Sequence, residues 1–142
     1  MKNVVVCGSY DVLHDGHLYF LGQSKQYGDL LYVALAPDEI ILQNKSRQPR
    51  NTLSQRAKIM RRIDVVDVVI ELLQGGSPAI EEILRIPPHV YCFGHDQRTP
   101  WDIELESRLR QSDVEVRTIR PYNRDTLSST KSLEMKLNNL DS

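Results

Sequence analysis

The sequence predicts an α/β fold in which helices cover both faces of a five-stranded, mainly parallel sheet. Two observations lead to this expectation. Short apolar runs rich in β-branched residues alternate with helical patterns along the 142-residue chain. Strands separated by helices are typical of βαβ units, which build parallel sheets. The run at residues 30–36 is nearly continuous in hydrophobicity, as expected for a strand that is covered on both faces.

The first strand is expected at residues 4–7, a β-branched run that stops at Gly8. A helical pattern follows from about residue 16 to residue 27. Gly28 then suits the left-handed position just past a helix end. The apolar run at residues 30–36, which closes at Pro37, predicts the second strand.

A polar, basic loop is predicted at residues 44–50. Thr52 is followed three residues later by Gln55, and this spacing is typical of a capping box at a helix start. A β-branched run at residues 65–73 predicts the third strand. This segment therefore adds one more helix and one more strand to the alternation.

The second half of the chain continues in the same way. Ser77 followed by Pro78 predicts a helix start, because proline is favoured at the first helical position. The remaining patterns predict a strand at 90–93, a helix at 101–111, a strand at 114–119 and a final helix at 129–137.

Composition favours one globular domain spanning residues 1–142. Hydrophobic residues make up 40% and charged residues 26%, close to globular averages. The net charge of −1 argues against a general nucleic-acid binder. No apolar run reaches the length of a membrane span, and no cleavable signal pattern is found, so a cytoplasmic protein is expected. Cys7 and Cys92 are expected to be buried, small apolar side chains rather than a redox pair.

The loop after the first strand holds the most unusual residues. In parallel sheets, ligands bind beyond the carboxyl ends of the strands. His14 and His17 flank Gly16 at the start of a helix, and positions three apart lie on one helix face. A helix N-terminus offers free N–H groups and a positive dipole end, so this loop predicts a phosphate site with two imidazole donors. A metal site is the weaker alternative, because no third ligand has suitable spacing.

The segment from Gly8 to His17 reads Gly-Ser-Tyr-Asp-x-x-His-x-Gly-His. It resembles the signature of the cytidylyltransferase-like nucleotidyltransferase superfamily, and the likeness extends over roughly residues 2–137. The resemblance implies a Rossmann-like, three-layer αβα sandwich. It also implies transfer of a nucleoside monophosphate from ATP or CTP to a phosphorylated acceptor, with release of pyrophosphate. The acceptor's own phosphate would attack the α-phosphorus, without a protein nucleophile.

The resemblance also implies roles for individual residues. His14, His17 and Lys45 would be catalytic, and Asp38 and Arg124 would contact the acceptor. No protein metal ligand is expected, and a Mg²⁺ or other divalent ion would come with the nucleotide. Nucleotide contacts are expected from Gly8, Ser9, Tyr10, Gly16, Arg56, Gly94, Asp96, Gln97, Ser128, Ser129 and Thr130.

Several of these positions have plainer interpretations. Residues 128–130 could be a helix cap, Lys45 part of a solvated loop, and Asp96 a turn residue. The superfamily's second signature begins Arg-Thr-x-Gly, whereas residues 123–126 read Asn-Arg-Asp-Thr. Arg124 is therefore shifted by one position and the glycine is missing. Asp11 is expected to be structural, holding the first loop by hydrogen bonds.

The acceptor and the nucleotide are less constrained by the sequence. Residues 94–97 read Gly-His-Asp-Gln and resemble archaeal FAD synthases, which favours FMN adenylylation. Glycerol-3-phosphate cytidylylation is the main alternative. A sugar-phosphate acceptor is a further one, because Arg47-x-Pro49-x-Asn51 resembles heptose-phosphate adenylyltransferases. The resemblance also implies a homodimer.

Other classes of function fit the sequence less well. A non-catalytic, nucleotide-binding regulatory module would tolerate loss of His14 or Lys45, and both are present. A fragment of a class I aminoacyl-tRNA synthetase fits less well, because no tRNA-binding domain is recognised in the sequence and the net charge is not basic. A dinucleotide-dependent oxidoreductase would carry a Gly-x-Gly-x-x-Gly fingerprint after the first strand, which this sequence lacks.

Overall fold

A computed structural model describes residues 1–122 and confirms the α/β fold. Strands and helices alternate with the parallel topology that the sequence predicts. The elements are β1 (Asn3–Gly8), α1 (Asp15–Lys25), β2 (Leu30–Leu35), α2 (Asp38–Lys45), α3 (Leu53–Met60), β3 (Val68–Glu71), α4 (Gly76–Leu84), β4 (Val90–Gly94), α5 (Pro100–Gln111) and β5 (Glu115–Ile119).

The five described strands form one sheet in the order β3-β2-β1-β4-β5, and every neighbouring pair is parallel. The chain first builds outward from β1 to β2 and β3, then crosses back to place β4 on the other side of β1. The strand order therefore reverses at β1. In such sheets a crevice opens at the carboxyl ends of the two strands that flank the reversal, here β1 and β4.

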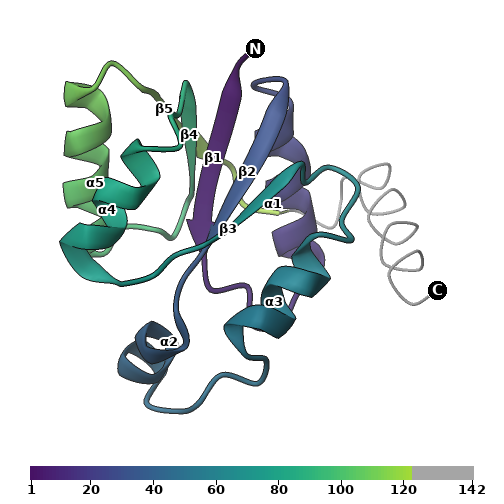
Figure 1. The fold of residues 1–142 in the computed structure, drawn as a ribbon. Coiled ribbons are helices and arrows are strands. Elements are labelled where there is room, and N and C mark those ends of the chain that lie inside the picture. Colours follow the sequence, from purple (N-terminus) through teal and green to yellow (C-terminus); the bar gives the residue numbers. More distant parts are fainter. Residues whose placement is uncertain (123–142) are drawn as a thin grey trace.

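Alternate side chains of each strand enter two separate cores. Val4 and Val6 of β1 pack with α1 and α3, whereas Val5 and Cys7 pack with α4 and α5. Figure 1 shows these two helix pairs on opposite faces of the sheet. Both faces of β1 are thus buried, which explains why its sequence is a continuous apolar run rather than an alternating one.

The structure differs from the sequence prediction around α2. Residues 44–50 were expected to form a polar loop, yet Asn44 and Lys45 are the last residues of α2. The helix was hard to recognise because Pro37 at its N-cap makes no side-chain cap bond and Ile41 is its one buried residue. Figure 1 shows α2 beyond the carboxyl end of the sheet rather than against either face.

Two glycine-linked predictions need correction. Gly28 is not in the left-handed region. A Cβ there would instead lie 2.7 Å from Val4 Cγ2 and 2.9 Å from the Lys2 carbonyl oxygen, so close packing against the start of β1 explains this glycine. The helix predicted to have Pro78 at its first position begins two residues earlier, at Gly76, after Gly75 as N-cap.

The predicted capping box at α3 is confirmed. Thr52 accepts from the Gln55 N–H, and the Gln55 side chain accepts in turn from the Thr52 N–H. Cys7 and Cys92 are buried, free thiols, as expected. None of the helices within residues 1–122 is long and apolar enough to cross a membrane. The predicted final helix at 129–137 lies outside the described residues.

Candidate active site

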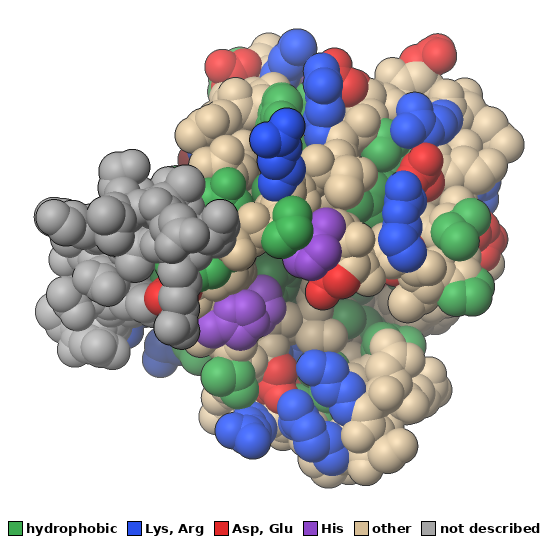
Figure 2. Space-filling model, turned by 180° about the vertical axis from the view of Figure 1, so that it is seen from behind, with side chains coloured by type: hydrophobic (Ala, Val, Ile, Leu, Met, Phe, Trp, Pro, Cys, Tyr) green, Lys and Arg blue, Asp and Glu red, His purple; other side chains and the backbone are tan. Residues whose placement is uncertain are grey.

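A cavity of about 990 Å³ lies at the carboxyl ends of β1 and β4. Figure 2 shows histidine side chains on the walls of this hollow and a group of Lys and Arg side chains beside it. Its walls come from the loop after β1, the start of α1, the end of α2, the loop after β4 and the segment after β5. The crevice predicted from the strand order therefore coincides with the predicted site.

Most of the predicted site residues within the described part of the chain meet in this cavity. The ones that line it are Gly8, Ser9, Tyr10, His14, Gly16, His17, Lys45, Gly94, Asp96 and Gln97. Asp38 and Arg56 are not among the lining residues. Arg124, Ser128, Ser129 and Thr130 lie outside the described residues.

The two histidines are held by the backbone at the start of α1. His14 is the N-cap, and its Nδ1 accepts a 3.1 Å hydrogen bond from the Gly16 N–H. His17 Nδ1 accepts in return from the His14 N–H, at 3.3 Å. The rings stack with their centroids 3.8 Å apart and their planes at 23°. Since each Nδ1 is an acceptor, we infer that the neutral form of each imidazole carries its proton on Nε2.

Two glycines make room for aromatic rings in this loop. A Cβ on Gly16 would lie 2.9 Å from His14 Cε1, and a Cβ on Gly8 would lie 2.8 Å from Tyr10 Cε2. Tyr10 itself has a positive φ of 48°, which turns the chain sharply after β1. Its ring then meets the His17 ring edge-on, with 5.3 Å between centroids.

Burial, together with the nearby charges of His14 and Lys45, lowers the pKa of His17 to about 4. Burial is the largest of these causes, whereas Asp96 acts in the opposite direction. His17 is therefore neutral near pH 7 and can donate a hydrogen bond through Nε2 without taking up a proton. A donor of this kind binds a phosphate oxygen without carrying a full positive charge into the site.

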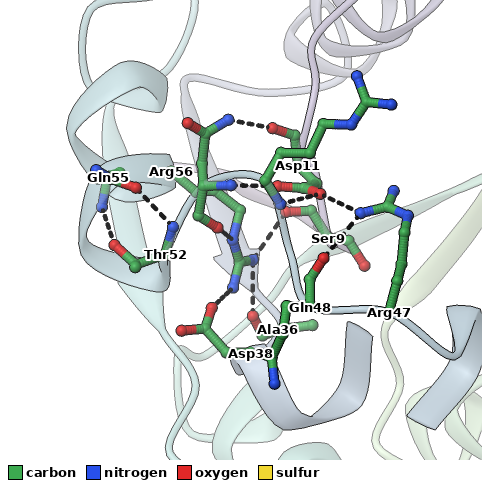
Figure 3. A network of polar contacts seen from close by, with 11 residues as sticks. Ser9, Asp11, Ala36, Asp38, Arg47, Gln48, Thr52, Gln55 and Arg56 are labelled. Atoms are coloured by element: carbon green, nitrogen blue, oxygen red, sulfur yellow. Dashed lines mark hydrogen bonds and ion pairs between the residues drawn. The ribbon is translucent and has the colours of Figure 1, made fainter. Parts of the chain in front are cut away.

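Asp11 joins the first loop to the segment before α3, as Figure 3 shows. The carboxylate is 6% exposed and accepts from the N–H groups of Arg50 and Asn51 at 2.9 and 2.8 Å. It also accepts from Arg47 Nη1 at 3.2 Å. Burial alone would raise the pKa of Asp11, but these three donors outweigh it and lower the pKa. The structural role predicted for Asp11 is consistent with these contacts.

Arg56 is buried at 1% exposure, although it was expected to contact the nucleotide. Its guanidinium donates to Asp38 Oδ1 at 2.7 Å (Figure 3). The remaining bonds go to the backbone carbonyls of Ser9, Ala36 and Asn51, at 2.9, 2.8 and 3.2 Å. All three guanidinium nitrogens are engaged in these bonds. Arg56 therefore links the ends of β1 and β2 to α2. It also binds the carboxylate of Asp38, which was expected to contact the acceptor.

The cavity also holds residues that the sequence reasoning did not assign to the site. Arg47, His95 and Arg120 line it, together with the aromatic side chains of Tyr19, Phe20 and Tyr122. Arg120 directly follows β5, and His95 directly follows β4. Their positions just past strand ends were a usable signal, because the carboxyl ends of parallel strands meet at one edge of the sheet.

No group of three or more His, Cys, Asp or Glu side chains that could hold a metal ion is found in the described part of the chain. The lining is instead rich in phosphate-binding groups: two imidazoles, a helix N-terminus and the cations Lys45, Arg47 and Arg120. This arrangement suits a polyphosphate more than a protein-bound metal.

A family model described as cytidylyltransferase-like matches residues 5–134. The FAD synthase of Pyrococcus abyssi is 39% identical over 121 residues, which cover 84% of this chain and 80% of the relative. The FAD synthase of Pyrococcus horikoshii is 35% identical over 135 residues, which cover 92% of this chain and 89% of the relative. The predicted superfamily resemblance is thereby confirmed.

Solved structures share the fold. The lipopolysaccharide core biosynthesis protein from Thermoplasma volcanium matches with a TM-score of 0.70 at 28% identity, over 87% of this chain and 98% of that one. Thermotoga maritima TmcAL, solved with bound α-thio ATP, matches with a TM-score of 0.63 at 15% identity, over 99% of this chain and 52% of that one. At that identity the second likeness shows the fold alone.

Proposed function

The chain belongs to the cytidylyltransferase-like family, and on that premise we propose that it transfers AMP from ATP to FMN and releases pyrophosphate. It is a nucleotidyltransferase, in keeping with its FAD synthase relatives. The observation that supports this reaction most directly is the pair of stacked imidazoles at the start of α1. Both have Nδ1 bound by a backbone N–H, which leaves Nε2 to donate to phosphate oxygens in the cavity.

The reaction needs positioning and charge stabilisation rather than a protein nucleophile. An oxygen of the FMN phosphate attacks the α-phosphorus of ATP. The new O–P bond forms while the bond between the α-phosphorus and the oxygen bridging to the β-phosphate breaks. Pyrophosphate leaves with that electron pair. Negative charge builds on the phosphate oxygens during this step, and preorganised donors that face it lower the barrier.

The donors of this chain divide into two groups by position. His14 and His17 stand at the helix start, where they would bind α- and β-phosphate oxygens. Lys45 and Arg47, at and just after the end of α2, would neutralise the departing pyrophosphate. Arg120 lies past β5, on the side of the crevice formed by β4 and β5, and would bind the second phosphorylated substrate.

A divalent ion such as Mg²⁺ is part of the proposal. Mg²⁺ keeps several waters and often binds through substrate phosphates rather than through a cage of protein ligands. The described residues, with phosphate-binding donors and no three-ligand cluster, fit an ion carried mainly by the nucleotide and water. When bound, the ion would neutralise phosphate charge.

The choice of FMN rests on the relatives and on the room in the cavity. FAD synthases are 30–39% identical to this chain over most of its length. The volume of about 990 Å³ is at the upper end for a small-molecule site, so it suits two ligands bound side by side. The partly buried aromatic residues Tyr19, Phe20 and Tyr122 offer an apolar wall for one of them.

Purified protein incubated with ATP, Mg²⁺ and FMN tests the proposal. We expect pyrophosphate release and a matching amount of FAD by chromatography, and neither product when FMN is left out. CTP in place of ATP should release much less pyrophosphate. Absence of FAD from the reaction with ATP and FMN would overturn the FMN proposal.

A sugar phosphate is the second candidate acceptor, and the likeness to the Thermoplasma volcanium lipopolysaccharide core biosynthesis protein favours it. The same assay with heptose 1-phosphate or glycerol 3-phosphate separates the candidates. Higher kcat/KM for either one than for FMN would assign the chain to that acceptor while leaving nucleotidyl transfer intact.

The remaining features are proposals that follow from the family. The protein would be a single domain, a homodimer and cytoplasmic. Light scattering of the purified chain, which should give twice the 16.3 kDa monomer mass, tests the homodimer.

A further inference from the structure

The ladder between β1 and β4 stops early. Within the described sheet, β1 pairs with β2 from Asn3 to Gly8, and β4 pairs with β5 from Val90 to Gly94. Between β1 and β4, in contrast, the pairs are Val4↔Val90 and Val5↔Tyr91. The last three residues of each strand therefore run toward the cavity without a direct ladder between them.

The direction of the backbone groups shows which rung would come next. The Lys2 and Gly8 carbonyls accept from the chain at β2, so the odd-numbered residues of β1 face β4. The His89 carbonyl accepts from Glu115 at β5, so the even-numbered residues of β4 face β1. Continuing the register would align residue 7 with residue 93. A parallel ladder would then join the Gly94 N–H to the Cys7 carbonyl.

The side chain of Gln97 occupies that position. The Gly94 N–H donates to Gln97 Oε1 at 2.8 Å, and Gln97 Nε2 donates to the Cys7 carbonyl at 3.0 Å. A carboxamide has the same donor and acceptor as a peptide group. The direct bond from Gly94 to Cys7 is thus replaced by two bonds with one amide between them. The Gln97 side chain therefore ties the ends of β1 and β4 together and keeps them further apart than a direct hydrogen bond would.

We propose that Gln97 is a positioning residue whose carboxamide replaces this rung and fixes the width of the nucleotide crevice between β1 and β4. The inference rests on the proposed function for the identity of the nucleotide. It goes beyond the expected role of Gln97 as a nucleotide contact, because each polar atom of the side chain makes a hydrogen bond to the backbone of a different strand end.

The tie joins the two loops that carry the site. The Cys7 carbonyl lies just before the loop that leads to His14 and His17, and Gly94 begins the loop that carries His95 and Asp96. If the tie is lost, the Gly94 N–H and the Cys7 carbonyl both lose their partner, and the strand ends can separate further. This movement displaces donors on one wall of the cavity relative to the other wall, so that the two walls no longer match one bound nucleotide.

Replacement of Gln97 by Glu provides a sharp test. A protonated Glu has one donor and one acceptor and can copy the amide, whereas an ionised Glu has acceptors on both oxygens and repels the Cys7 carbonyl. We expect the ratio of ATP affinity in Q97E to that in the wild type to rise as pH falls from 8 to 5. Q97A should bind ATP about tenfold more weakly at every pH, and its KM for ATP should rise more than its kcat falls.

The ratio removes the effects of other ionisable groups because both proteins share them. These groups include Asp96 on the same loop, His17 on α1 and Tyr10 after β1, which line the same cavity as His14, Lys45 and His95. Asp102 of α5 and Glu82 of α4 act on Cys7 from the opposite face. Gln111→Glu and Gln111→Ala are matched controls, since Gln111 lies on the exposed surface of α5 and bonds to Ser107.

Hydrogen exchange of the Gly94 amide gives a second measurement that needs no substrate. We expect its protection to fall in Q97A and to return in Q97E at low pH. If Q97A does not fold, the pH dependence of ATP affinity and of Gly94 protection in Q97E still tests the proposal. The proposal would be overturned if the ratio of ATP affinity in Q97E to that in the wild type did not change with pH. It would also be overturned if Q97A lost the protection of the Gly94 amide but kept its ATP affinity. Calorimetric ATP binding requires no acceptor, so a failure to make FAD would count against the proposed function alone.

Discussion

Two backbone N–H groups orient the imidazoles at the start of α1. The Gly16 N–H holds the ring of His14, and the His14 N–H holds the ring of His17. The same bonds satisfy N–H groups that every helix start leaves free. A capping arrangement and a pair of aligned donors are therefore one structure, and neither ring can turn without exposing an unpaired amide.

Replacing His17 with Ala should lower kcat by about 100- to 1000-fold, because it removes one preorganised donor and releases the His14 backbone. Steady-state kinetics and circular dichroism would check activity and fold together. His89→Ala is the matched control. His89 Nδ1 accepts from the Asn3 N–H at the opposite end of the sheet, so that variant should lose about 1 kcal/mol of stability and keep its kcat. Normal turnover in the His17 variant would remove His17 from the catalytic machinery.

The lowered pKa of His17 predicts a pH effect on stability. As pH falls, the unfolded chain protonates this histidine near 6.5, whereas the folded protein does so near 4. The contribution to stability is thus complete above about pH 6.5 and is lost as pH falls through 4. Urea unfolding at pH 7 and pH 5 should show a smaller loss for His17→Asn than for the wild type. An NMR titration of His17 with a midpoint near 6.5 would contradict the expectation.

The sequence indicated some contacts of these residues but not others, and the reason is physical. The histidine pair could be predicted because a short spacing at a helix start determines its geometry. Arg56 and Gln97 were expected to bind the nucleotide, but both are engaged with backbone carbonyls or amides. Such bonds join residues that are distant in the sequence, and a single sequence holds no signal for which carbonyls will be near.

At the scale of elements, α2 and α3 are positioned by polar contacts as much as by apolar packing. Arg56 projects from α3 and binds the carbonyls at the ends of β1 and β2, while Asp38 from the first turn of α2 pairs with it. This connection explains why a helix as short as α2 can lie beyond the sheet. It also explains why α2 escaped prediction, since its position depends on an arginine from another element.

Replacing Arg56 with Ala should lower the free energy of unfolding by about 3 kcal/mol, because three carbonyls and Asp38 lose their buried donor. Arg56→Lys should recover part of this loss, since one ammonium group cannot reach all of these acceptors. Arg61→Ala is the control. Arg61 is 54% exposed, lies 3.6 Å from Glu71 and should matter by less than about 0.5 kcal/mol in urea unfolding. Equal losses for Arg56→Ala and Arg61→Ala would contradict the role given to Arg56.

At the scale of the whole molecule, the strand order decides where the site lies. The reversal at β1 places the loop of His14 and His17 opposite the loop after β4, with Lys45 reaching in from α2. Alternating strand and helix signals were enough to predict the sheet and its parallel character. The exact order and the early end of the β1–β4 ladder depend on packing between distant segments, so they became visible in the structure.

ATP should stabilise the whole fold by mass action. At a free concentration 100 times its Kd, the gain is about 2.7 kcal/mol, measurable as a shift of the thermal midpoint. Lys45→Ala should reduce that shift, because Lys45 lines the cavity. Lys58→Ala removes an exposed lysine of α3 that does not line it and should leave the shift unchanged. Equal shifts in the two variants would argue against a role for Lys45 in binding.

The carboxylate of Asp11 has a consequence for the exchange of parts between related enzymes. It accepts hydrogen bonds from the backbone of Arg50 and Asn51. The position of the segment that bears Lys45 and Arg47 therefore depends on the turn that bears the histidines. A chimera that imports residues 44–52 from a relative with another acceptor should work when the matching turn is imported with it. If residues 44–52 are exchanged alone, the hydrogen bonds between this segment and the host's turn should be lost, because the host's turn is matched to a different segment.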